Sequence, residues 1–230
     1  MDNLQDKFKI IYPSNNDVDW EKFAIDNTRK EFLYDIVQKI VYTVQDLNNE
    51  YIYTKEITTK DIIYIISLVR WISRSMYLLR KSIKEKATKK FQFPDEEELK
   101  KAKEYLDALR SFAVAHPLDT SDHAKFSLDG SKICVDIRTR KMVEAIFGEG
   151  RIKAKRFSFD GIIESNDVQT ADYYLYIYSK EDNYSTGEFI ACYFDDLYKT
   201  AQLYINKLCA LEQFLIGLGE VTNDQTGTVN

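Results

Sequence analysis

The sequence contains little glycine, proline, cysteine or histidine. Its 230 residues include 8 Gly, 3 Pro, 3 Cys and 2 His. These low counts exclude collagen-like and low-complexity chains, and 44% hydrophobic residues with 30% charged residues exclude disorder. A chain of this length buries roughly 70% of the surface that its unfolded form exposes, so its core needs no metal or disulfide. We predict one domain over residues 1–222, two smaller domains being the alternative, and a flexible tail over 221–230.

Signals for secretion or membrane insertion are also lacking. The first fifteen residues have no basic start followed by an apolar run. The longest nearly unbroken apolar stretch, Ile62 to Val69, is far shorter than the ~20 residues that span a bilayer. The three cysteines, Cys134, Cys192 and Cys209, are far apart and without CxxC spacing, which is typical of reduced thiols. We therefore expect a cytoplasmic protein with no membrane partner.

The charge balance is acidic, with 32 Lys and Arg against 37 Asp and Glu, a net charge of −5. Sequence-independent binding to nucleic acid needs a surplus of basic residues, so the overall charge argues against a protein that coats nucleic acid. A local basic patch is still allowed.

Residues 17–116 carry the apolar periodicity of three amphipathic helices. The first runs from Val18 to Asn49. The second begins after Thr58 or Thr59, either of which is a suitable N-cap, and its apolar stripe continues to Ile83. The third follows a proline and four acidic residues at 94–98, which suit a helix N-terminus, and ends before Pro117.

A last helix is predicted over residues 195–218. Its apolar residues recur at alternating spacings of three and four, a heptad seam that requires a partner helix. The partner is either the chain's own bundle or a second subunit. The seam consists of Phe194, Leu197, Ala201, Tyr204, Leu208, Leu211, Leu215 and Leu218.

Residues 125–194 have a β-rich pattern. Short segments of β-branched and aromatic residues alternate with Asp-Gly, Ser-Asn-Asp and Ser-Thr-Gly turns, which predicts three or four antiparallel strands. A short helix is expected from Thr139 to Phe147, and Tyr174, Tyr176 and Tyr178 line one face of their strand. The predicted fold class is α+β, with a small antiparallel β-sheet inserted before the C-terminal helix.

Both histidines, His116 and His123, lie close to Asp119 and Asp122, so a metal site was one interpretation of this window. The spacing lacks the helical geometry of HExxH, and no other segment offers a third histidine. The motifs GxSxG, GxxxxGK[ST] and GxGxxG are absent as well. We therefore expect no metal and no cofactor.

The remaining feature is Arg110 followed six residues later by His116, in LRSFAVAHP at the end of the third helix. This spacing resembles the Arg-x4-6-His signature of the HEPN superfamily. The resemblance implies a HEPN-like four-helix bundle, formed by the three N-terminal helices and the C-terminal helix, and a homodimer. It also implies metal-independent RNA cleavage, in which His116 assists attack by the 2′-hydroxyl and Arg110 stabilises the charged transition state.

The expected function is therefore an RNA endonuclease or toxin of the kind found in phage-defence modules, with a cognate antitoxin or regulatory protein as a further expected partner. The other interpretation of the motif is structural. In that case Arg110 caps the end of its helix or pairs with Asp107, and His116 packs under the turn.

A second function class follows from the segment 138–156, interpreted as a basic hairpin. Its seven basic residues exceed Glu144 and Glu149 by five, and the tyrosine-rich strand lies nearby. The second class is a non-catalytic interaction protein, either a dimerisation or scaffold module or an RNA binder, in which basic groups would hold phosphates and aromatic faces would stack on bases. A solvated hairpin is the structural alternative. The candidate RNA-binding residues are Arg138, Arg140, Lys141, Arg151, Lys153, Lys155 and Arg156.

Overall fold

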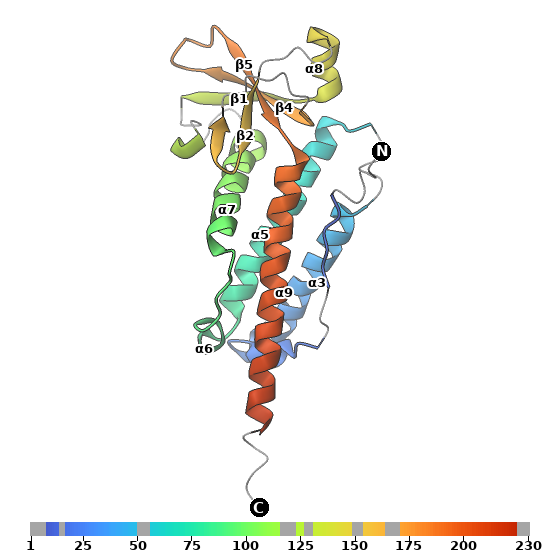
Figure 1. Cartoon of the computed structure of the whole chain (residues 1–230), viewed down its shortest axis with the longest axis vertical. Helices are drawn as coiled ribbons and strands as arrows, with labels where there is room; N and C mark the ends of the chain where they lie inside the picture. The colour runs from blue at the N-terminus through green and yellow to red at the C-terminus, as the bar shows by residue number, and fades with distance from the viewer. Residues whose placement is uncertain are drawn as a thin grey trace, which may run out of the picture.

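The computed structural model describes residues 8–13, 17–49, 56–115, 123–126, 131–148, 154–163 and 171–224, the last six by their backbone only. Four long helices run beside one another below a β-sheet (Figure 1). They are α3 (Lys30–Leu47), α5 (Thr59–Ser82), α7 (Glu96–Arg110) and α9 (Phe194–Asp224). The short helix α6 (Glu85–Thr88) lies between α5 and α7 in the chain. The fold is thus mixed α and β.

The single helix expected from Val18 to Asn49 is wrong in its first part. The chain instead forms α2 (Trp20–Phe23), a 3-10 turn η1 (Asn27–Arg29) and then α3. The break is held by Asp26, whose carboxylate accepts a hydrogen bond from the Thr28 hydroxyl at 2.6 Å while its backbone is extended. Short polar side chains compete with helical hydrogen bonds in this way. The chain then bridges to the end of α5, where the Ile25 amide donates to the Ser82 carbonyl at 2.9 Å.

Helix α5 begins as the sequence predicted, with Thr58 as its N-cap. The Thr58 hydroxyl accepts from the Asp61 amide, and the Asp61 carboxylate accepts from the Thr58 amide at 2.8 Å, a complete capping box. Among the described helices, α5 alone is long and apolar enough to cross a membrane, but 56% of its most apolar window is buried in the protein. The buried part of its apolar stripe packs in the core of the protein.

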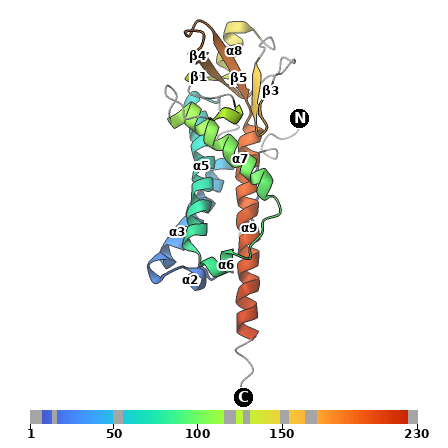
Figure 2. The ribbon, with the colours of Figure 1, turned by 90° about the vertical axis from the view of Figure 1, so that its left-hand side faces the viewer.

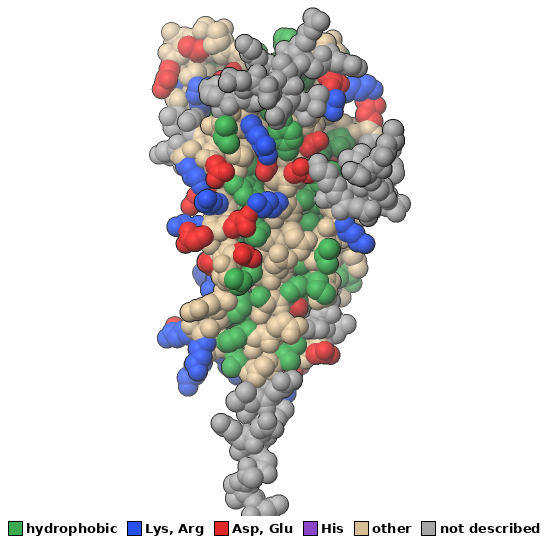
Figure 3. Space-filling view, in the orientation of Figure 1, with side chains coloured by type: hydrophobic (Ala, Val, Ile, Leu, Met, Phe, Trp, Pro, Cys, Tyr) green, Lys and Arg blue, Asp and Glu red, His purple; other side chains and the backbone are tan. Residues whose placement is uncertain are grey.

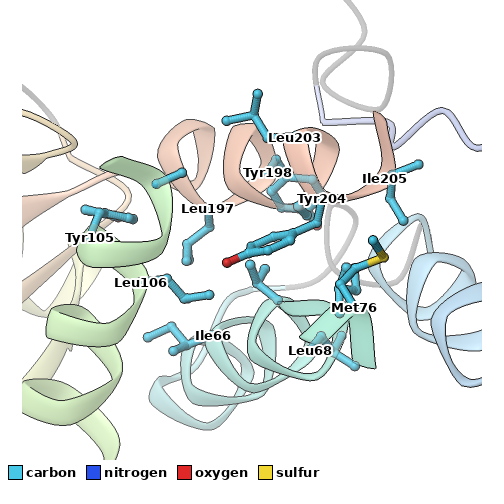
Figure 4. Packing of buried hydrophobic residues seen from close by; sticks show 14 of the residues in the cluster. Ile66, Leu68, Met76, Tyr105, Leu106, Leu197, Tyr198, Leu203, Tyr204 and Ile205 are labelled. Carbon is cyan, nitrogen blue, oxygen red and sulfur yellow. The ribbon is translucent and has the colours of Figure 1, made fainter. Parts of the chain in front are cut away.

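Helix α9 packs its heptad seam within its own chain. Every seam residue from Phe194 to Leu215 is at most 5% exposed. Figure 4 shows Leu106 of α7, Ile66 of α5 and Leu197 of α9 approaching one another in this core. Of the two partners predicted for the seam, the structure therefore has the chain's own helices. The helix also continues to Asp224, past its predicted end at Leu218, while 225–230 lie outside the described residues.

The sheet has five strands in the order β1-β4-β5-β2-β3. Their bounds are β1 (Lys132–Thr139), β2 (Lys155–Ser158), β3 (Gly161–Ile163), β4 (Tyr173–Ser179) and β5 (Gly187–Cys192). The prediction of an antiparallel sheet is wrong for one pair, because β2 and β5 are parallel. The β2–β3 hairpin is added to the free edge of β5, away from β1. The short helix expected near 139–147 is confirmed as α8 (Arg140–Phe147), with Thr139 as its N-cap.

One apolar core joins the helices to the sheet. The Tyr105 ring of α7 lies 5.0 Å from the Phe157 ring of β2, and both side chains are fully buried. On the opposite face of the sheet, Val143 of α8 packs with Tyr174 and Ala191 in a smaller cluster. The sheet is therefore covered by the bundle on one face and partly by α8 on the other.

Candidate functional site

Arg110 is the last residue of α7, and the chain continues as a π-helical turn over Ser111–Ala115. Such turns are rare and occur often at functional sites. The Arg110 side chain as a whole is half-buried, but its Nε atom is buried and has no hydrogen-bond partner among the described residues. The end of α7 thus holds a buried guanidinium N–H that no described group satisfies.

The pairing of Arg110 with Asp107, the structural alternative, is not formed. The Asp107 carboxylate is bound instead by Arg70 and Lys103, with N–O distances of 2.6 Å to each of its two oxygens. Two cations on one carboxylate leave a net positive charge beside Arg110, so Asp107 does not neutralise the guanidinium.

The other half of the motif, His116, lies outside the described residues, as do Pro117, Asp119 and Asp122. His123 is described, and its Nε2 atom is buried without a hydrogen-bond partner among the residues that the structure describes. Within the described ranges, His, Cys, Asp and Glu side chains form no group of three that could hold a metal ion.

The segment 138–156 is not a hairpin, which corrects the sequence interpretation. Its two strands, β1 and β2, are separated in the sheet by β4 and β5, and α8 lies between them in the chain. The cations therefore do not share one ribbon. Arg151 and Lys153 lie outside the described residues.

Each described cation of this segment has a carboxylate partner. The pairs are Arg138–Asp136 at 3.0 Å, Arg140–Glu144 at 2.6 Å, Lys141–Glu56 at 3.0 Å, Lys155–Glu188 at 3.3 Å and Arg156–Asp196 at 3.5 Å. Arg138 also stacks on the Tyr176 ring, 4.6 Å from its centroid. Acidic and basic side chains are likewise interspersed on the face shown in Figure 3. Pairing reduces the charge that this segment offers to a phosphate.

Sequence reasoning missed a cleft between α5, α7 and α9. Its volume is about 400 Å³. Figure 2 views the side of the molecule on which α7 crosses α5 and α9. Six cations line the cleft and only one acidic residue does: Arg70, Arg74, Arg80, Lys100, Lys103 and Lys207 against Glu96.

The floor of this cleft combines apolar side chains with two hydroxyl groups. The Ser73 hydroxyl donates to the Tyr204 hydroxyl at 2.9 Å, and Met76 and Leu99 complete the lining. Lys207 is only 4% exposed, and its ammonium donates to the Glu96 carboxylate. Burial lowers the pKa of Lys207, although the Glu96 carboxylate opposes this shift.

One face of α7 connects the cleft with Arg110. Glu96, Lys100, Lys103, Asp107 and Arg110 follow one another at spacings of three and four, so they form a single row on the helix. At 1.5 Å per residue, Arg110 lies about 10 Å along the axis from Lys103. Two of the cleft cations, Lys100 and Lys103, therefore share one helix face with the predicted catalytic arginine, with Asp107 between Lys103 and Arg110.

A sequence signal for the cleft does exist. Arg70, Arg74, Tyr77 and Lys81 repeat every three or four residues beside the apolar stripe of α5. The sequence pattern alone does not distinguish that row from the ordinary solvated face of an amphipathic helix. The matching row on α7 and Lys207 on α9 become neighbours only in the folded chain.

Comparison with models of protein families, with curated proteins and with solved structures finds no match for this chain. The HEPN resemblance therefore gains no support from them, and the function is argued from the site.

Proposed function

We propose that this protein is an RNA endonuclease of the HEPN kind, with Arg110 and His116 acting on the phosphodiester. The observation that carries the proposal is the position of Arg110 at the end of α7, on the helix face that also carries Lys100 and Lys103, with a buried Nε that has no hydrogen-bond partner among the described residues. A half-buried guanidinium is a strong ligand for a phosphate, because its planar N–H groups match two phosphate oxygens.

The proposed reaction needs no metal. His116 accepts the proton of the 2′-hydroxyl as the 2′-oxygen forms a bond to phosphorus. Arg110 stabilises the charge that develops on the phosphoryl oxygens. The bond from phosphorus to the 5′-oxygen then breaks, and that oxygen takes a proton from an imidazolium or water. The products are a 2′,3′-cyclic phosphate and a 5′-hydroxyl.

The remaining expectations from the resemblance belong to the same proposal. The four long helices would be the HEPN-like bundle, and a homodimer would bring two Arg110–His116 pairs into one cleft. A cytoplasmic location and a role in a toxin or phage-defence module, with a cognate antitoxin, would follow.

The test is RNA cleavage by purified protein in EDTA, with Arg110→Ala and His116→Ala. We expect each variant to lose at least about 100-fold in rate, the usual contribution of a general base or of a charge-stabilising group. Arg138→Ala is the matched control, since it removes an arginine that is paired on the sheet, and it should cleave at the wild-type rate. Equal cleavage by wild type and by His116→Ala would assign the activity to a contaminant and refute the proposal.

The alternative, non-catalytic RNA binding by segment 138–156, finds less support because its described cations are paired. It predicts RNA retention without cleavage and loss of retention when Lys153, Lys155 and Arg156 are changed to Glu. Unchanged retention in that triple variant would exclude it.

A further inference from the structure

The cleft between α5, α7 and α9 collects positive charge on a protein whose net charge is −5. Some of this charge is neutralised, because Arg70 and Lys103 share Asp107 and Lys207 binds Glu96. Three cations of the rim, Arg74, Arg80 and Lys100, form no close ion pair with a carboxylate in the described part of the chain, although Glu104, one turn further along α7, attracts Lys100. Unpaired cations that converge on one concave site favour a ligand with more than one negative charge.

Size and lining distinguish this site from a flat basic patch. A volume of about 400 Å³ lies in the range of small-molecule sites, which combine an apolar lining with a few polar groups. Met76 and Leu99 supply the apolar part, and the hydroxyl pair of Ser73 and Tyr204 supplies the polar part. Inorganic phosphate alone would leave this apolar floor uncovered, so the ligand also carries an apolar or aromatic group.

An aromatic ring stands at the rim beside the unpaired cations. Tyr77 is 45% exposed, and its ring centroid lies 4.9 Å from the Arg74 guanidinium and 4.6 Å from the Lys81 ammonium. Exposed aromatic rings next to cations are the usual arrangement for stacking a base while its phosphate is held.

We propose that this cleft binds a nucleoside phosphate, with its phosphates on Arg74, Arg80 and Lys100 and its base against Tyr77. The ligand is either a free nucleotide or the terminal nucleotide of an RNA strand, because both present the same chemistry. The assignment uses neither Arg110 nor His116, so it does not depend on the cleavage reaction and stands if the proposed nuclease activity fails.

Calorimetric titration of the full chain tests this assignment with four probes: ATP, AMP, inorganic pyrophosphate, and a 5′-phosphorylated, 2′-O-methylated tetranucleotide that cannot be cleaved. We expect ATP or the tetranucleotide to bind, and the preferred probe identifies the source of the nucleotide. Arg74→Glu/Lys100→Glu should weaken binding at least about tenfold. Both side chains lie at the rim, so circular dichroism should show an unchanged fold.

Two further variants separate the parts of the proposal. Lys60→Glu/Lys86→Glu makes the same change in net charge on exposed lysines away from the cleft, and it should bind as wild type does. Tyr77→Ala should weaken nucleotide binding about tenfold, in the range of one lost stacking contact, and leave pyrophosphate binding unchanged.

Three results would overturn the assignment. The first is no binding of any probe at millimolar concentration. The second is binding that Arg74→Glu/Lys100→Glu does not weaken. The third is equal affinity for pyrophosphate and ATP with no effect of Tyr77→Ala, which would mean a phosphate site without base recognition.

Discussion

The carboxylate of Asp196 should destabilise the fold, and replacing it by a neutral amide should cost nothing. Asp196 lies in the first turn of α9 and is 9% exposed. The nearest Arg156 nitrogen, Nη2, is 3.5 Å from Oδ2, and Oδ2 has no hydrogen-bond partner within the described ranges. Burial raises the pKa of Asp196 in spite of the attraction to Arg156. The free energy lost by burying the charged carboxylate is therefore larger than the free energy gained from its attraction to Arg156.

Asp196→Asn should therefore leave the free energy of unfolding at pH 7 unchanged or raise it by up to about 1 kcal/mol. Removing the buried charge stabilises the fold, but it also removes a favourable interaction with the helix dipole, which is of similar size and opposite sign. Arg156→Met should act in the opposite direction. It leaves the buried carboxylate without its cation and removes the stacking of Arg156 on the Tyr193 ring, 4.8 Å away. We expect a loss of about 2 kcal/mol, less than the 3–5 kcal/mol of a fully buried pair, since the Arg156 side chain is 41% exposed.

The same charge predicts a pH dependence. A carboxyl whose pKa is raised on folding binds its proton more tightly in the folded state than in the unfolded state. Its contribution to stability is therefore complete below the ordinary value of 3.8 and is lost as pH rises through the raised pKa of folded Asp196. Asp196→Asn should remove this loss, and Arg156→Met should enlarge it.

Urea unfolding followed by circular dichroism between pH 4 and pH 8 measures these effects, with the double variant completing the cycle. Asp196→Asn should restore most of the stability lost in Arg156→Met. Lys155→Met, on the same strand, breaks an exposed pair with Glu188 and should cost at most about 0.5 kcal/mol. A loss of more than about 2 kcal/mol in Asp196→Asn, with Arg156→Met unchanged, would refute the reasoning.

Three other changes test the packing. Thr58→Ala removes the capping box of α5 and should lower the free energy of unfolding by about 1 kcal/mol in urea titrations; an unchanged midpoint would contradict the role of the cap. Leu106→Ala opens a cavity in the fully buried helix core and should cost about 2–5 kcal/mol in the same titration, whereas a loss below about 1 kcal/mol would place Leu106 outside the core. Gly187→Ala would place a methyl group on the Tyr176 ring and should cost about 1–3 kcal/mol with altered near-UV dichroism, while a wild-type spectrum and melting temperature would show that the ring moves freely.

The helices could be predicted because their signals are local. The apolar stripe on α5 and the heptad seam on α9 show which residues face the core. The start of α5 is signalled by Thr58 and its capping partner Asp61, which are only three residues apart. The break at Asp26 was missed because the apolar periodicity starts before it. The hydrogen bond that competes with the helix there joins two polar side chains, Thr28 and Asp26, and an apolar pattern does not record polar contacts.

The sheet and the cleft depend on contacts between distant residues. Each strand carried its β pattern, but nothing near Lys155 indicates that β2 pairs in parallel with Ile190 of β5. In the same way, Arg74 and Lys100 belong to rows on two different helices, and only the packing of α5 against α7 makes them one site. Local patterns thus predicted the elements, whereas the site required the tertiary arrangement.

In the proposed function, Arg110 and His116 promote RNA cleavage by attack of the 2′-hydroxyl. The most direct measurement compares one RNA oligonucleotide with the same sequence in 2′-deoxy form, in EDTA, with wild type and His116→Ala. Wild type should cleave only the RNA and leave a 2′,3′-cyclic phosphate, and His116→Ala should cleave neither strand. Cleavage of the deoxy strand, or undiminished RNA cleavage by His116→Ala, would contradict it.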